Sequence, residues 1–81
     1  MLSALNGPFI SGIAVTADNS NTFTQIPRGI YVGGSGDVAI RWKNGQGNTV
    51  FKAVPVGTIL NIRPDVIWST GTTATNLVIL F

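Results

Sequence analysis

Apolar and polar residues alternate most clearly between residues 37 and 43. Every second residue there is large and apolar, so one face of an extended strand is predicted to carry Val38, Ile40 and Trp42. The opposite, outward face is predicted to carry Asp37, Ala39, Arg41 and Lys43. Residues 44–47 read Asn-Gly-Gln-Gly, which tolerates the positive φ angles of a turn, and residues 48–54 then run back. The pattern predicts a β-hairpin.

Short segments rich in β-branched and aromatic residues make up most of the remaining chain. Proline, glycine or runs of Asn, Ser and Asp separate them. The further strands predicted in this way cover residues 12–17, 22–26, 29–32, 57–63, 66–70 and 75–81. No long stretch has the periodicity and caps of a helix. The predicted fold is all-β, a small antiparallel β-sandwich or barrel of about six to eight short strands. Residues 13–81 form its single domain, and residues 1–12 form an N-terminal arm.

The composition makes such a domain marginal on its own. The chain has 81 residues, of which 44% are hydrophobic and 10% charged, with a net charge of +2. A domain of this size buries only about 60% of the surface that its unfolded chain exposes. The sequence has no Cys and no His, which removes disulfides and the commonest metal ligands. We therefore expect stability to come from partners, through oligomerisation or docking on a larger assembly.

Two predicted strands are apolar on both faces. Residues 77–81 are all apolar, and residues 50–54 nearly so, although a two-layer domain has one dry face per sheet. Either a loop or the N-terminal segment covers the outward row, Val78 and Leu80, or this row is a subunit interface. The predicted partner interface combines apolar and cationic side chains: Met1, Leu2, Leu5, Phe9, Val78, Leu80, Arg41, Lys43 and Lys52.

Catalytic chemistry finds little support. Without His and Cys there is no Ser-His or Cys-His pair, and the three carboxylates, Asp18, Asp37 and Asp65, each occupy an ordinary turn position. We predict no enzyme activity and no cofactor. A weak Ca²⁺ site at Asp18, Asn19 and Asn21 is a minor alternative. The glycine-rich residues 33–36 lack the Lys of a phosphate-binding loop and predict a tight turn that needs positive φ.

The basic residues of the hairpin, Arg41, Lys43 and Lys52, are expected to form a modest positive patch. Single-stranded nucleic-acid binding would need exposed aromatic rings beside them, and the aromatic residues here fall in strands, so no nucleic-acid partner is predicted. A solvated face, an acidic protein partner or a glycan remain open. Trp68 is interpreted as a core residue, with a sugar-stacking platform in a small lectin-like module as the alternative.

No membrane partner is predicted. The longest wholly apolar run, residues 77–81, is far shorter than the ~18 residues of a membrane-spanning helix. Residues 1–9 have no basic region and are interrupted at Asn6-Gly7-Pro8, which argues against an export signal. We expect synthesis in a cytoplasm.

Three motifs resemble a known family. They are YVGGSGDV at residues 31–38, VPVGTIL at 54–60 and TGTTATN at 70–76, in this order and at plausible spacing. They are similar to elements of the head-spike base proteins of gene transfer agents and related phage particles, and of small head-decoration proteins. The resemblance spans residues 13–81. It implies a non-enzymatic all-β virion protein on the capsid exterior, either a decoration (cement) subunit or a vertex spike base. The implied partners are sister copies in a trimer or pentamer, the major capsid protein, and a spike or fibre protein.

Overall fold

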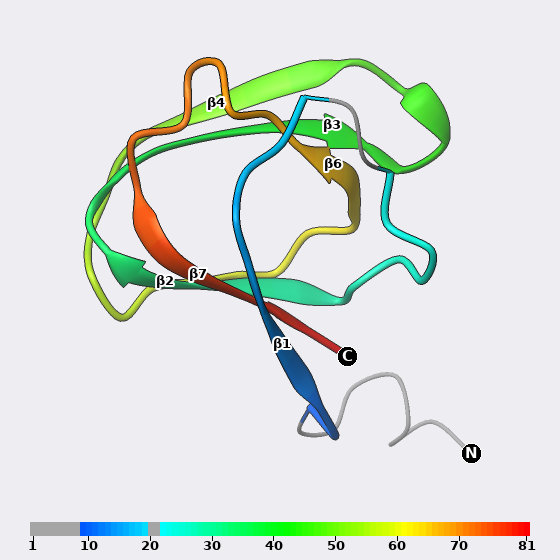
Figure 1. Cartoon of the computed structure of the whole chain (residues 1–81), viewed down its shortest axis with the longest axis horizontal. Coiled ribbons are helices and arrows are strands. Elements are labelled where there is room, and N and C mark those ends of the chain that lie inside the picture. The colour runs from blue at the N-terminus through cyan, green and yellow to red at the C-terminus, as the bar shows by residue number, and fades with distance from the viewer. Residues whose placement is uncertain (1–8, 20–21) are drawn as a thin grey trace.

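The computed structural model describes residues 9–19 and 22–81. Within them, seven strands form two antiparallel sheets. The four-stranded sheet has the order β1 (Gly12–Val15), β7 (Thr75–Leu80), β2 (Gly29–Gly34) and β5 (Ile59–Leu60). The three-stranded sheet has the order β4 (Asn48–Val54), β3 (Gly36–Trp42) and β6 (Pro64–Ile67) (Figure 1). The prediction of an all-β fold with about six to eight strands is confirmed.

The hydrophobic core lies between the two sheets, and Figure 1 shows β4, β3 and β6 above β2 and β7. Its centre consists of β-branched and Leu side chains that are at most 4% exposed: Ile30, Val32, Val38, Ile40, Ile67, Leu77 and Ile79. Val38 and Ile40 are fully buried, and Trp42 packs against the same cluster, as the alternation predicts. Burial of apolar surface, at about 25 cal/mol per Å², is the main source of stability in a chain without crosslinks.

The predicted hairpin is present, with one change at its tip. β3 ends at Trp42, and Lys43 opens a short 3₁₀ turn, η1 (Lys43–Gly45), instead of extending the strand. Gly45 and Gly47 have φ angles of 69° and 107°, the positive values that the turn prediction required. Three other predicted strands are wrong in extent. The predicted strand 66–70 is β6, Pro64–Ile67, and ends before Trp68. Residues 22–26 form no strand, and the segment 57–63 is extended only at β5.

The glycine-rich junction between β2 and β3 mainly allows its backbone to lie close to neighbouring segments of the chain. Only Ser35 separates the two strands, so the chain passes from one sheet to the other almost without a loop. A Cβ on Gly33 would lie 2.5 Å from the carbonyl oxygen of Asn76 on β7, and Gly34 is equally crowded by Thr75. Gly36 alone in this run has a positive φ, 153°. The expected tight turn is thus a sheet-to-sheet crossing that lacks room for side chains.

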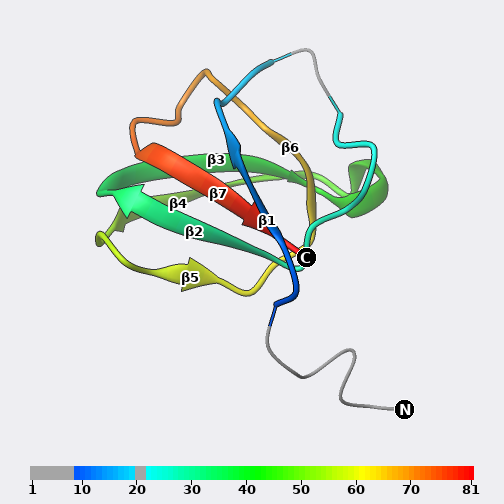
Figure 2. The same cartoon turned by 60° about the horizontal axis from the view of Figure 1, so that its bottom comes forward.

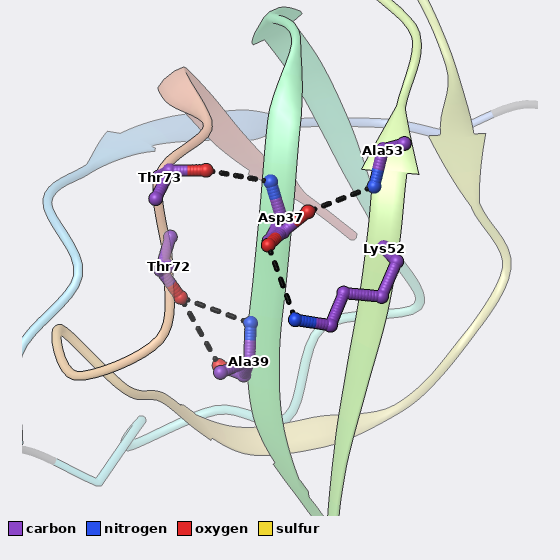
Figure 3. Close-up of polar contacts among 6 residues, drawn as sticks. All are labelled: Asp37, Ala39, Lys52, Ala53, Thr72 and Thr73. Carbon is purple, nitrogen blue, oxygen red and sulfur yellow. Dashed lines mark hydrogen bonds and ion pairs between the residues drawn. The ribbon is translucent and has the colours of Figure 1, made fainter.

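Ala39 was predicted to point outward, yet it is only 3% exposed. The loop 70–74 covers it and hydrogen-bonds the backbone of β3 (Figure 3). The N–H of Ala39 donates to the Thr72 hydroxyl over 2.9 Å, and the N–H of Asp37 donates to the Thr73 hydroxyl over 2.8 Å. Alternation alone fails here because a distant loop covers what would otherwise be a solvated face.

A β-bulge lies where β3 meets the end of β4. Gly36 pairs with Val54 and Val38 pairs with Phe51, so Asp37 alone stands opposite two residues, Lys52 and Ala53. Ala53 adopts a left-handed φ of 51°. The Asp37 carboxylate accepts the N–H of Ala53 over 2.8 Å and lies 3.5 Å from the Lys52 ammonium (Figure 3). These contacts lower the pKa of Asp37, the Ala53 N–H contributing most.

Ala53→Gly is expected to raise the free energy of unfolding by about 0.5–1 kcal/mol, because glycine adopts positive φ without the strain of a Cβ. Part of the gain is offset by the greater freedom of glycine in the unfolded chain. Urea unfolding measures the change. Val50→Gly in the same strand, at a position without positive φ, should instead destabilise; equal effects of the two substitutions would contradict the explanation.

Acid is expected to remove the contribution of Asp37 to stability. Because its folded pKa lies below the ordinary value of 3.8, the contribution is complete above that value and is lost as pH falls through the folded pKa. Asp37→Asn should lower the thermal midpoint at pH 7, and its difference from the wild type should shrink as pH falls below the ordinary value of 3.8. A difference that does not change with pH would show that the charge of Asp37 is unimportant.

Candidate interaction surface

The outward face of the four-stranded sheet is apolar because β7, near its middle, is apolar on both sides. Leu77 and Ile79 enter the core, whereas Val78 and Leu80 point outward and are half-buried. Val78 lies opposite Ala14 on β1 and Tyr31 on β2, and paired residues of an antiparallel ladder share a face. Tyr31 in turn lies opposite Ile59 on β5. We call Ala14, Tyr31, Ile59, Val78 and Leu80 the outer apolar face.

This face crosses the whole sheet and contains no charged residue. Tyr31 and Ile59 are 37% and 43% exposed, unusually open for large apolar side chains in neighbouring strands. Gly12 on β1 has no side chain and so leaves space for Val78, because a Cβ at Gly12 would lie 3.1 Å from Cγ1 of Val78. An uncharged apolar face of this kind is typical of a surface that another chain covers.

Phe9 covers one end of the sheet. It is half-buried, and its ring lies where a Cβ on Gly29 would point, at 3.1 Å from the ring edge. Leu80 is the ladder partner of Gly29, so Phe9 packs beside it on the outward side. The Arg28 guanidinium carbon lies 5.4 Å from the centre of the Phe9 ring, within the range of a cation–π contact. Phe9 therefore covers the Leu80 end of the outer apolar face, and Tyr31 and Ile59 stay exposed. Met1, Leu2 and Leu5 lie outside the described residues.

The predicted positive patch is divided by ion pairs. Arg41 donates to Asp65 through Nε and Nη2, over 2.8 and 3.0 Å, and the Asp65 side chain is only 7% exposed. This pairing lowers the pKa of Asp65 and raises that of Arg41. Lys52 is exposed and lies beside Asp37. The sequence pattern missed the Arg41–Asp65 pair because the two residues are 24 positions apart and meet only when β6 pairs with β3.

Lys43 stands apart from the other two cations. It is exposed on η1, and its backbone N–H donates to the Arg63 carbonyl over 3.0 Å. The backbones of the two basic residues Lys43 and Arg63 therefore lie side by side at one end of the three-stranded sheet. No sequence signal indicated this, because the contact joins the hairpin tip to the segment before β6.

Trp68 is not a core residue, contrary to the interpretation from sequence. Ile67 points into the core, so the next residue points outward, where Trp68 is half-buried. Its Nε1–H donates to the Asn48 side chain over 3.0 Å, and the Arg41 guanidinium lies 6.0 Å from its ring centre. Through these two contacts, the Trp68 ring is held by other side chains of the same domain.

The polar segments offer no catalytic or metal-binding arrangement. A groove of about 420 Å³ runs between residues 15–17 and 69–77, but hydroxyl, amide and apolar groups line it and no ionisable side chain does. Asn19, a candidate Ca²⁺ ligand, instead accepts the N–H groups of Ser69 and Thr70. In residues 9–19 and 22–81, no three His, Cys, Asp or Glu side chains gather in a way that could hold a metal ion. Nor does any helix in these ranges have the length and hydropathy to cross a membrane.

Comparison with known proteins identifies a structural relative. No protein-family description matches the chain, and no curated protein sequence matches it. A chain in the solved structure "Capsid of native GTA particle computed with C5 symmetry" is 28% identical and superimposes with a TM-score of 0.84. The match covers 95% of this chain and 88% of the other. GTA denotes a gene transfer agent, so the chain is related to a capsid component of a phage-like particle, which points to a structural role associated with a capsid.

Proposed function

We propose that this protein is a structural subunit on the exterior of a phage-type capsid, which oligomerises and binds the capsid shell. The observation that carries the proposal is the near full-length match to a chain of the GTA capsid structure. The outer apolar face supports it independently, because the exposed Tyr31 and Ile59 beside half-buried Val78 form an apolar surface that a neighbouring chain could cover.

Two capsid roles fit this proposal, a vertex spike base and a lattice decoration subunit. In the spike-base role, a pentamer of this protein would stand at a fivefold vertex, contact the major capsid protein below and carry a spike or fibre protein above. In the decoration role, the subunit would cap the junctions between capsomers. The subunit would be made in the host cytoplasm and would end on the particle surface.

Affinity in this role would come from repeated burial of modest areas. Each 100 Å² of the outer apolar face removed from water contributes about 2.5 kcal/mol before the costs of association. A symmetric particle presents the same contact many times, so weak single contacts sum to a stable coat. Apolar residues of the N-terminal arm, Met1, Leu2 and Leu5, would add to the contact with a neighbouring chain.

The other functions considered from sequence find no supporting feature. A lectin-like site would use the Trp68 ring, which contacts Arg41 and Asn48 instead. Binding of single-stranded nucleic acid would use Arg41, Lys43 and Lys52. Arg41 and Lys52 lie beside carboxylates, and Lys43 is exposed on η1, apart from the other two. Neither is proposed further.

Ile59→Lys is expected to weaken binding to cognate capsids by about tenfold or more, because it buries a charge in the outer apolar face. Co-sedimentation of the purified protein with capsids that lack it measures the bound fraction. Val56→Lys is the matched control, since Val56 is 64% exposed in the turn that precedes β5. Undiminished binding by Ile59→Lys would exclude this face from the contact.

Backbone amides of residues 1–8 are expected to exchange more slowly with solvent in particle-bound protein than in free protein, because the arm is proposed to pack on a neighbour. Hydrogen exchange followed by mass spectrometry of N-terminal peptides measures the difference. Equal protection in the two states would remove the arm from the proposed interface.

A further inference from the structure

β1 is an open edge of the four-stranded sheet. Its ladder partner is β7, and the pairing extends to Ser11, whose carbonyl accepts the N–H of Phe81 over 2.9 Å. Hydrogen-bonded and non-hydrogen-bonded pairs alternate along an antiparallel ladder. Since Ser11 bonds to β7, Ile13 and Val15 do so as well, and the N–H and C=O groups of Gly12 and Ala14 point away from the sheet. No other segment in residues 9–19 and 22–81 pairs with this side of β1.

β1 also lacks the features that normally prevent edge strands from pairing. Residues 10–17 contain no charged residue and no proline. Ile10 and Ile13 are 88% and 55% exposed. Two of the other edge strands, β5 and β6, are better protected. β5 has two residues, and the free side of β6 is bonded by the N–H groups of Asp18 and Phe23.

β4 is the second long edge, and it is open in its first half. The N–H of Trp42 donates to the Gly47 carbonyl, so by the same alternation the backbone groups of Asn48 and Val50 point away from β3. Val50 is 43% exposed. The bulge at Lys52 and Ala53 ends the flat part of this edge.

The two open edges lie on opposite sides of the sandwich. β4 leads through one turn to β5, so these strands share one side (Figure 2). The chain after β1 hydrogen-bonds to β6, where the N–H of Asp18 donates to the Ile67 carbonyl, so β1 and β6 share the other side.

We propose that copies of this chain assemble head to tail by strand addition, with β1 of one copy pairing along β4 of the next. The inference rests on the proposed function and names the contact that would close its ring. A closed ring of more than two copies needs two different, complementary patches on each copy, because a patch that pairs with itself gives a twofold dimer. β1 and the first half of β4 are two such patches, of similar length and on opposite sides. Main-chain hydrogen bonds would give affinity, as in other strand additions.

Chemical crosslinking tests the pairing directly, since the chain has no native Cys. The variant with both Ile13→Cys and Val50→Cys is treated with a short bismaleimide. It should give a ladder of covalent oligomers whose largest member has as many subunits as the ring. The variant with Ile13→Cys and Gln25→Cys is the control and should give no ladder, because Gln25 closely follows Phe23, whose N–H donates to Asp65 of β6 on the side away from β4. Dimers formed by Ile13→Cys alone with equal efficiency would overturn the proposal in favour of β1 pairing with itself.

Ala14→Pro provides a second readout. Proline removes an N–H that points to solvent in the isolated chain, which an edge strand tolerates. We expect the cooperative thermal transition to persist while the native mass falls from the oligomer to the monomer. Ala14→Ser should keep the oligomer. If Ala14→Pro does not fold, Ile13→Lys tests the same edge. An unchanged oligomer in a folded edge variant overturns the proposal.

Failure of this inference can be distinguished from failure of the proposed function. If the wild-type protein binds capsids by co-sedimentation but the variant with Ile13→Cys and Val50→Cys gives no crosslink on the particle, the strand pairing alone is rejected. If that variant forms the crosslinked ring but the wild-type protein never binds capsids, the pairing is supported and the capsid role is rejected.

Discussion

Burial of β7 on both of its faces is the constraint on which the rest of the structure depends. Leu77 and Ile79 complete the core between the sheets, and the alternation of a strand then forces Val78 and Leu80 outward. The fold covers this outward row only in part, by β1 on one side, β2 on the other and Phe9 at one end. Among the residues that the structure describes, Tyr31 and Ile59 on this outward side remain exposed.

Hydrogen bonds from loops replace the crosslinks that the chain lacks. The loop 70–74 bonds the backbone of β3 through the Thr72 and Thr73 hydroxyls, and Asn19 bonds the segment after β6. Asp37 holds the bulge, and Asp65 holds Arg41. Each contact joins segments far apart in sequence, so these bonds fix loops and strands to one another around the small core.

The structural match gives this architecture a biological setting. A domain that exposes an apolar sheet face and an unprotected edge strand is poorly suited to life as a dilute monomer. In the proposed particle the same features would be contacts with identical neighbours and a shell. The relation to a GTA capsid chain and the chemistry of the surface therefore point to the same kind of protein.

The sequence by itself determined the elements whose signals are local: the hairpin of β3 and β4, the inward Val38 and Ile40, the positive φ at Gly45 and Gly47, and the two-sided apolarity of β7. Tertiary structure decided what covers those elements. It buried Ala39 under the loop 70–74, paired Arg41 with Asp65, turned Trp68 outward and left residues 22–26 without a ladder. The physical reason is range: alternation and turn chemistry act between neighbours in sequence, whereas burial and ion pairing depend on segments that meet only after the two sheets have formed.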